Sequence, residues 1–479
     1  MSLKTFGKQS LIYGISTILA RMVSFLLLPL YTNVFSRAEY GIVSLAYAFM
    51  GFALILYRYG TDTALMKFYV DSGKSKEKTV FTNVFGLITM TGILFSICLV
   101  LFRKSLVPVI LGASGEPIWI VLIAGILFFD MLWNMAVIIL RTEEKPVLFS
   151  AFSFANVLLM MALNIVFVVV CKFGVLGVLI SNFITSGVLF LFALMIILPR
   201  FSFSLLDSNW LKKIVRFSLP FLPAGVFTMV MELADRYILE FVHSTEAVGF
   251  YSAGYKIGMF MLLVVMGFNM GWTPYFLKQK NNLDAPNEFR KITTIFVGIA
   301  GFFLIIFSAW AEKIVQIQIF GYSFFGEKFW QSTDIVPVIL LGYFFFGLYV
   351  LQLPGVFLAE KTKFVPVFRG LGALLNIGLN FWLISLFSQN INSVSMAAAA
   401  ATAVAFFGMA TAIFFTNRKI YPIRYFWRGI LFPLVFFTLF GFVPDELSWK
   451  IGLSFAYFPM WFIVGLDNEH RQIIRGLFS

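Results

Sequence analysis

Long apolar runs separated by short charged loops are the feature that most restricts this chain. A membrane-spanning helix needs about 20 mainly apolar residues, and by that measure the sequence holds about fourteen candidate spans. The runs are too long and too uniformly apolar for barrel strands, and lipid admits only helices or closed barrels. The sequence therefore predicts an all-α polytopic membrane protein with spans at 10–34, 40–66, 80–102, 117–140, 147–170, 174–198, 217–241, 247–275, 292–311, 332–356, 364–387, 394–415, 429–443 and 447–466.

Composition agrees with a membrane protein. Of 479 residues, 60% are hydrophobic and only 12% are charged, whereas soluble domains run near a quarter charged. The net charge of +13 would suggest a nucleic-acid partner in a soluble chain. Here the Lys and Arg side chains fall mainly in alternate loops. With the N-terminus inside, the inner loops hold more than three times as many as the outer loops, which predicts that both termini are cytoplasmic and that no nucleic acid is bound.

The sequence offers no arrangement typical of catalysis. Cys98, Cys171, His243 and His470 are scattered, so no metal site or cofactor is predicted. No phosphate-binding loop or nucleophile–base pattern is present, which favours a transporter that does not hydrolyse ATP. A membrane-embedded glycosyltransferase or polymerase is disfavoured, because the longest outer loop, 312–331, is short and semi-apolar. That segment could instead form an interfacial helix.

Two local matches indicate an internal repeat. Ser36 to Tyr47 and Ser244 to Tyr255 both read S-x4-G-x2-S-x2-Y, at an offset of 208 residues. Glu144-Lys145 and Leu163-Asn164 match Glu360-Lys361 and Leu379-Asn380 at an offset of 216. Each match falls at an equivalent place in a six-span half, and both halves begin on the same side. The sequence therefore predicts a parallel repeat, with a substrate site near the midplane between the halves.

Five cations lie inside the predicted spans: Arg21, Arg58, Arg236, Lys256 and Arg369. A charge at the bilayer centre costs roughly 2.5–3.5 kcal/mol on insertion scales, so such residues usually face a bundle interior or a wet cavity. Arg21, Arg58, Lys256 and Arg369 are therefore candidate ligands for an anionic substrate.

Each of these four candidate cations also has a structural interpretation. Lys256 could pair with the acidic cluster toward the outer end of the seventh span. Arg21 could pair with Asp62 or Asp130. Arg58 and Asp62 are four residues apart and could form one intrahelical pair. Arg369 is close enough to the inner end of its span to extend toward water.

Acidic residues and prolines supply further candidates. Glu232, Asp235 and Arg236 lie toward the outer end of the seventh span. Such a cluster is typical of a solvated helix end, and the alternative is a carboxylate site that couples proton or cation binding to transport. Pro29 in the first span and the Pro220/Pro223 pair in the seventh lie in the leading helices of the two halves. They are candidate hinges, although prolines often kink spans without functional meaning.

The chain resembles polysaccharide flippases. The similarity lies in Gly14 with Arg21, in Leu28-Pro29-Leu30-Tyr31, in Ser36 to Gly41, in Asn156 with Leu163-Asn164 and Gly174-x-x-Gly177, and in Asn376 to Asn380 followed by the Ala-rich 397–401. These patterns are similar to those of the multidrug/oligosaccharidyl-lipid/polysaccharide (MOP) exporter superfamily, and within it to the O-antigen and capsule-type, Wzx-like flippases. The loop 388–394 departs from the family pattern, because it lacks the usual glycines.

The resemblance implies two six-helix lobes around a cavity, arranged as in MATE transporters, with two further C-terminal helices. We expect the lobes at residues 1–200 and 201–416, and the added helices at 417–479. The implied activity moves a polyprenyl-diphosphate-linked oligosaccharide from the inner to the outer leaflet of a bacterial inner membrane. The implied partners are that lipid-linked glycan, the bilayer, and a polysaccharide polymerase and glycosyltransferases. A lipid II flippase and a multidrug or cation antiporter of the same superfamily are the alternatives.

Overall fold

The predicted spans are helices in the computed structural model, which describes residues 25–319, 321–441 and 446–472. Each of the fourteen predicted spans overlaps a described helix, and the first does so only over its C-terminal end. Within the described residues, ten helices pass the length and hydropathy test for a span, and a bent pair makes an eleventh if it is one span. The fold class predicted from the sequence, an all-α polytopic membrane protein, is confirmed. Contacts divide the chain into two compact units, residues 1–249 and 250–479.

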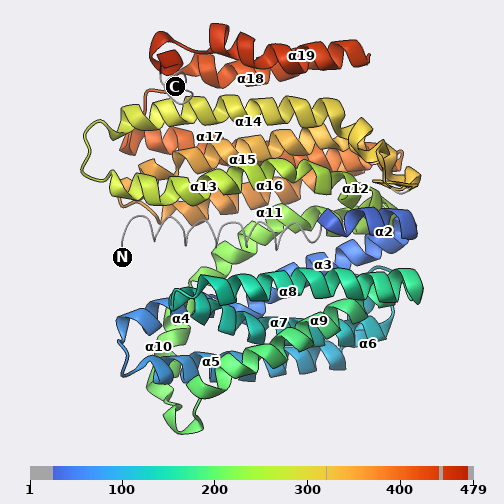
Figure 1. Cartoon of the computed structure of the whole chain (residues 1–479), viewed down its shortest axis with the longest axis vertical. Coiled ribbons are helices and arrows are strands. Elements are labelled where there is room, and N and C mark those ends of the chain that lie inside the picture. The colour runs from blue at the N-terminus through green and yellow to red at the C-terminus, as the bar shows by residue number, and fades with distance from the viewer. Residues whose placement is uncertain (1–24, 320, 442–445, 473–479) are drawn as a thin grey trace. The chain divides into compact units, whose positions relative to one another are not determined.

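Unit 1 is a helical bundle built around α7 (Figure 1). Its elements are α2 (Leu28–Val34), α3 (Arg37–Arg58), α4 (Thr61–Asp71), α5 (Glu77–Leu101), α6 (Arg103–Ile110), α7 (Pro117–Thr142), α8 (Pro146–Asn164), η1 (Ile165–Val170), α9 (Gly174–Ile197), η2 (Leu198–Arg200), η3 (Phe203–Leu205), α10 (Ser208–Ser218) and α11 (Phe221–Val242). Helix α12 (Thr245–Gly258) crosses the boundary into unit 2. Only 17% of the apolar window of α5, and of the window that covers α8 and η1, is buried. Their remaining apolar side chains are therefore available to lipid.

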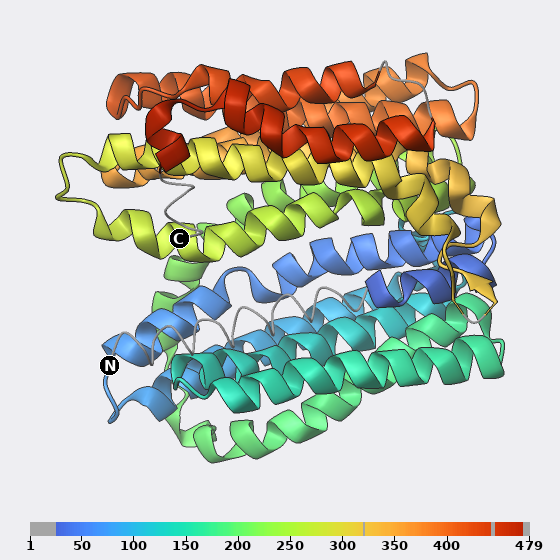
Figure 2. The ribbon, with the colours of Figure 1, turned by 45° about the horizontal axis from the view of Figure 1, so that its top comes forward.

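Unit 2 is a second bundle, with α15 at its centre. It contains α13 (Phe260–Lys278), α14 (Ala285–Gln316), β1 (Gln318–Ile319), β2 (Tyr322–Ser323), η4 (Glu327–Ile335), α15 (Val336–Leu358), α16 (Phe364–Leu386), α17 (Ile391–Ile420), α18 (Trp427–Phe440), α19 (Leu447–Met460) and η5 (Trp461–Gly465). Figure 2 shows the helices of this unit running side by side, with α18 and α19 against α14.

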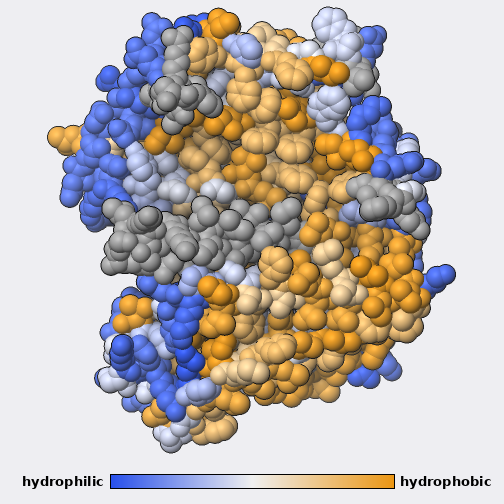
Figure 3. All heavy atoms as spheres, in the orientation of Figure 1, coloured by the Kyte–Doolittle hydropathy of each residue, from blue (hydrophilic) through white to orange (hydrophobic). Residues whose placement is uncertain are grey.

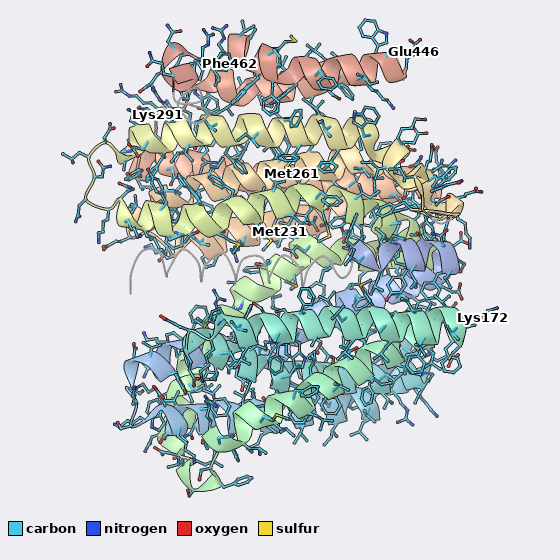
Figure 4. The ribbon with its side chains drawn as sticks, in the orientation of Figure 1. Lys172, Met231, Met261, Lys291, Glu446 and Phe462 are labelled. Atoms are coloured by element: carbon cyan, nitrogen blue, oxygen red, sulfur yellow. The ribbon has the colours of Figure 1, made fainter. Side chains whose placement is uncertain are left out.

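The last two spans are packed parts of unit 2. Ile305 of α14 contributes to an apolar cluster with Phe436, Tyr457 and Trp461. The Tyr457 hydroxyl donates a 2.8 Å hydrogen bond to the carbonyl of Gly298. The absence of a side chain at Gly298 lets the Trp461 ring lie directly against α14. Figure 4 shows Lys291, near the start of α14, and Glu446, just before α19, at opposite ends of this unit.

The segment 312–331 does not form the interfacial helix suggested by the sequence. Helix α14 continues to Gln316, and a short antiparallel hairpin follows, in which Gln318 pairs with Ser323. Gly321 adopts a φ of +84°, a left-handed conformation that suits a tight hairpin turn. The 3-10 helix η4 then leads into α15.

Side-chain hydropathy follows the helix axes within each unit. Figure 3 shows hydrophobic residues along the lengths of the helices and hydrophilic residues at their ends. In unit 1, Lys172 is exposed just after η1 and projects from the end of the bundle (Figure 4). This distribution is expected for helices whose middle portions lie in hydrocarbon.

Candidate functional site

Arg58 ends helix α3, and the intrahelical pair with Asp62, one of the two interpretations that the sequence left open, does not form. Tyr59 and Gly60 adopt left-handed φ values of 31° and 84°, so α3 stops and α4 begins anew at Thr61. The two side chains therefore lack the continuous helix on which a four-residue spacing brings partners together. Among the described residues Arg58 makes no salt bridge, and its Nε atom is buried without a hydrogen-bond partner.

The break between α3 and α4 lies at a tertiary contact. A side chain at Gly60 would lie 2.6 Å from the carbonyl oxygen of Ser218 and 2.9 Å from Cβ of Phe221. Gly60 thus packs against the junction between α10 and α11, where the chain bends by 42°. The Thr61 hydroxyl donates a 2.6 Å bond to the carbonyl of Arg58, which the break would otherwise leave unpaired.

Asp130 lies inside unit 1 near the Arg58 guanidinium. It is fixed by hydrogen bonds from the Trp133 indole at 2.8 Å and from the Ser186 hydroxyl of α9 at 2.7 Å. Asp62 and Asp130 both attract Arg58 electrostatically, but neither lies within salt-bridge distance of it. The structure thus brings three predicted residues together as one cation with two nearby carboxylates. Arg21, the fourth candidate in this half, lies outside the described residues.

Asp235 and Arg236 on α11 are buried rather than solvated. Asp235 is fully buried, Arg236 is 5% exposed, and Nη1 of Arg236 lies 2.9 Å from Oδ1 of Asp235. Arg236 also donates to the backbone carbonyl of Glu232 at 2.7 Å, while Glu232 itself is half-buried. The interpretation as a solvated helix end is therefore wrong for this pair, because α11 packs along α3 and covers it. The role of the pair in coupling stays a prediction.

Lys256 and Arg369 belong to unit 2 and are both half-buried. Lys256 lies in the last turn of α12. Arg369 lies on α16 beside the Tyr349 side chain of α15. Whether these cations and Arg58 line one cavity stays a prediction, as does the division into lobes at residues 200 and 416.

The three candidate hinge prolines lie at helix starts. Pro29 is in the first turn of α2, and Pro223 is in the first turn of α11. A proline costs little there, because the first amide groups of a helix have no intrahelical acceptor. Pro220 precedes α11 at the 42° bend after α10. The bend gives Pro220 the geometry of a hinge, and its motion stays a prediction.

The repeat has a structural basis that the sequence alone did not reveal. The Ser36 hydroxyl accepts from the Glu39 amide at 3.2 Å, and the Ser244 hydroxyl accepts from the Ala247 amide at 3.3 Å, so both begin a helix in the same way. In the second match, Asn164 donates to Met160 O and Asn380 donates to Asn376 O, each at 2.8 Å.

The two copies of the first motif also contact each other. A side chain at Gly41 would overlap the carbonyl of Thr245, and one at Gly249 would overlap the carbonyl of Arg37. Arg37 and Thr245 occupy equivalent positions, as do Gly41 and Gly249, so the contact is reciprocal. Reciprocal contacts of this kind are the mark of a two-fold axis. The two copies of the motif therefore pack against each other through the N-terminal turns of α3 and α12.

Comparison with known proteins identifies a family and a fold that this chain matches. The profile of a family described as polysaccharide biosynthesis protein matches residues 6–280. No curated protein sequence matches the chain. The lipid II flippase MurJ in an inward closed conformation superposes with a TM-score of 0.73 at 15% identity, covering 94% of this chain and 98% of that one.

Two further solved structures have the same fold at lower similarity. An inward-facing multidrug resistance MATE family transporter of the MOP superfamily gives a TM-score of 0.58 at 15% identity, covering 92% of this chain and 96% of that one. A MOP superfamily transporter from Pyrococcus furiosus, described as having a binding pocket of reverse polarity, gives a TM-score of 0.58 at 14% identity, covering 91% of this chain and 97% of that one.

Proposed function

Because the chain belongs to the polysaccharide biosynthesis protein family of the MOP superfamily, we propose that it flips a polyprenyl-diphosphate-linked oligosaccharide from the inner to the outer leaflet of a bacterial inner membrane. The observation that carries the proposal is the Arg58 guanidinium, which lies within a membrane bundle without a salt-bridge partner among the described residues. Arg58 is half-buried with its Nε atom buried, and such a cation can form charge-assisted hydrogen bonds with a diphosphate.

The proposed mechanism needs only the diphosphate and sugars to pass through the protein. Arg21, Arg58, Lys256 and Arg369 would hold the anionic group in a space where reduced hydration strengthens attraction. The polyprenyl tail would stay in the bilayer. Alternating access would rock the two repeated halves, with Pro29, Pro220 and Pro223 as hinges. Both termini would be cytoplasmic, and transport would not consume ATP within this chain.

Two alternatives remain in view. Lipid II carries the same diphosphate, and the similarity to the MurJ fold supports that cargo equally. The site residues therefore do not separate the two glycans. A multidrug or cation antiporter has the same fold. Because Asp62 and Asp130 near Arg58 would attract a cation, the binding test below decides between the two kinds of cargo.

Binding to the purified protein tests the proposal. We expect polyprenyl-diphosphate glycans to bind more tightly than the matching uncharged polyprenol glycans. Replacing Arg58 and Lys256 by Gln should reduce the difference in affinity between the charged and uncharged lipids. A separate comparison of the affinities for lipid II and for polymer-type diphosphate oligosaccharides, which carry the same charge, would identify the glycan. Equal affinity for charged and neutral lipids in the unmodified protein would refute the proposal, and tight binding of cationic dyes would favour the antiporter.

A further inference from the structure

Helix α10 carries a cationic pocket that the proposed transport site does not use. The pocket has a volume of about 500 Å³ and is lined by Phe68, Lys212, Lys213, Arg216 and Phe217. Pockets of this size are large enough for small-molecule ligands. All the lining residues belong to α4 or α10 within unit 1. Figure 3 shows hydrophilic residues gathered at the place where Figure 1 draws these two helices.

The sequence of α10 makes it amphipathic. Ile214 and Ser218 are buried, with Trp210, Leu211 and Phe217 half-buried on the same side. Lys212, Lys213 and Arg216 are exposed on the other side. An amphipathic helix with a basic polar face is typical of one that lies at the surface of a bilayer. The 42° bend before α11 lets α10 leave the direction of the following span.

Aromatic rings position two of the ammonium groups. Lys213 Nζ lies 4.8 Å from the centre of the Phe68 ring and 4.7 Å from that of Trp210. Lys67, which precedes Phe68 on α4, has its Nζ 4.9 Å from the Phe217 ring. Contacts between cations and aromatic faces at this distance are favourable. The rings therefore hold charge at the edge of the pocket without neutralising it.

The pocket cations have no anionic partner in the described part of the chain. Lys67, Lys212, Lys213 and Arg216 form no salt bridge there. The nearest acidic residue along α10, Asp207, caps the helix start by accepting from the Asn209 amide at 2.9 Å. Three cations line the pocket, Lys67 lies against its Phe217 ring, and apolar rings adjoin them. This arrangement is complementary to a group that is anionic and attached to an apolar chain.

We propose that this pocket binds the phosphate head group of an anionic phospholipid in the inner leaflet. The proposal goes beyond cargo transport and uses only the inside orientation of α10 from the proposed function. The lipid phosphate would contact Lys212, Lys213 and Arg216, while its acyl chains pass along the half-buried Phe217 into the bilayer. Basic clusters beside spans on the cytoplasmic side recognise anionic lipids in this way.

Native mass spectrometry of the full-length protein in detergent tests the lipid site. Titration with phosphatidylglycerol and with phosphatidylcholine of the same acyl chains should give clearly tighter binding of phosphatidylglycerol. The variant Lys212→Gln/Lys213→Gln/Arg216→Gln should lose about tenfold or more of that affinity. The matched control Lys74→Gln/Lys76→Gln/Lys78→Gln removes equal charge from exposed positions in the α4–α5 connection and the first turn of α5, and it should retain that affinity.

A charge-preserving variant guards against misfolding. Lys212→Arg/Lys213→Arg/Arg216→Lys should bind phosphatidylglycerol as the unmodified protein does. Equal losses in the pocket and loop variants, or no preference between the two lipids, would overturn the proposal. Displacement of the lipid by soluble glycerol phosphate at a similar concentration would also overturn it, since the site would then recognise a free phosphate. None of these readouts depends on the glycan cargo, so failure here leaves the flippase proposal standing.

Discussion

At the scale of single residues, Arg58 carries most of the functional argument. Its position in a span was evident from the sequence, but its lack of a salt bridge was not. The four-residue spacing to Asp62 allowed a pair as one of two interpretations. Gly60, which packs against Ser218 158 positions away, lies at the break in the helix between Arg58 and Asp62. No local pattern encodes a contact at that separation.

Replacement of Arg58 distinguishes a binding role from a structural one. We expect Arg58→Ala to reduce transport at least about tenfold at normal protein abundance, because no directly paired carboxylate is left uncompensated. Arg58→Lys should retain part of the activity, since it keeps the charge but loses the forked hydrogen bonds. Transport complementation and membrane abundance are the measurements. A well-expressed Ala variant with full activity would remove Arg58 from the site.

Glu143 illustrates a residue with a stabilising role. Burial alone would raise the pKa of its carboxyl, but hydrogen bonds from Lys145, Arg200 and Tyr69 outweigh burial and hold the pKa below its ordinary value. The stabilisation is therefore present above the unfolded pKa of about 4.3 and is lost as the pH falls through the lower folded value.

The pH dependence of thermal unfolding tests this role. Glu143→Gln should lower stability by about 1–3 kcal/mol at neutral pH, and the difference from the unmodified protein should shrink below pH 4. Glu144 is adjacent to Glu143 and exposed, so Glu144→Gln is a matched control. It should unfold at the same temperature as the unmodified protein at every pH. If the stability difference between Glu143→Gln and the unmodified protein stays constant from pH 7 to pH 3, the ionised Glu143 carboxylate does not contribute to stability as proposed.

At the scale of helices, the reciprocal contact between α3 and α12 organises the repeat. Gly41 and Gly249 were recognised in the sequence as equivalent positions. Their spacing alone could not reveal that each glycine lies against the other helix's first turn. The sequence predicted most helix positions because an apolar run of span length forms a helix when it crosses a lipid bilayer. It missed the break at Gly60 and the hairpin near Gly321, which depend on packing and turn conformation.

Substitution of Gly41 tests the helix contact. Gly41→Ala should destabilise the protein by about 1–3 kcal/mol, because the added methyl group overlaps the Thr245 carbonyl. Gly267 of α13 has no neighbouring atom within 4 Å of an added side chain. Gly267→Ala is therefore a matched control that should be neutral or slightly stabilising. Equal thermal midpoints for the two variants would rule out close packing at Gly41.

At the scale of the whole molecule, the distribution of Lys and Arg sets the proposed orientation. In a background in which Cys98 and Cys171 are replaced by Ser, an impermeant thiol reagent applied to intact cells should label Ser114→Cys. It should not label Lys74→Cys or Lys419→Cys, which we place in the cytoplasm. All three positions are exposed, so access to the side chain is not limited by packing. Labelling at 74 or 419 with protection at 114 would invert the proposed orientation.

Reconstituted translocation tests the central claim most directly. The purified protein is placed in vesicles that carry a fluorescent polyprenyl-diphosphate oligosaccharide, and the fraction of head groups reached by a membrane-impermeant quencher is followed over time. We predict that the protein equilibrates the lipid between leaflets, that the matching polyprenol glycan stays in its leaflet, and that Arg58→Ala vesicles resemble empty ones. Equal translocation of the charged and uncharged lipids, or none of either by a correctly folded protein, would contradict the account.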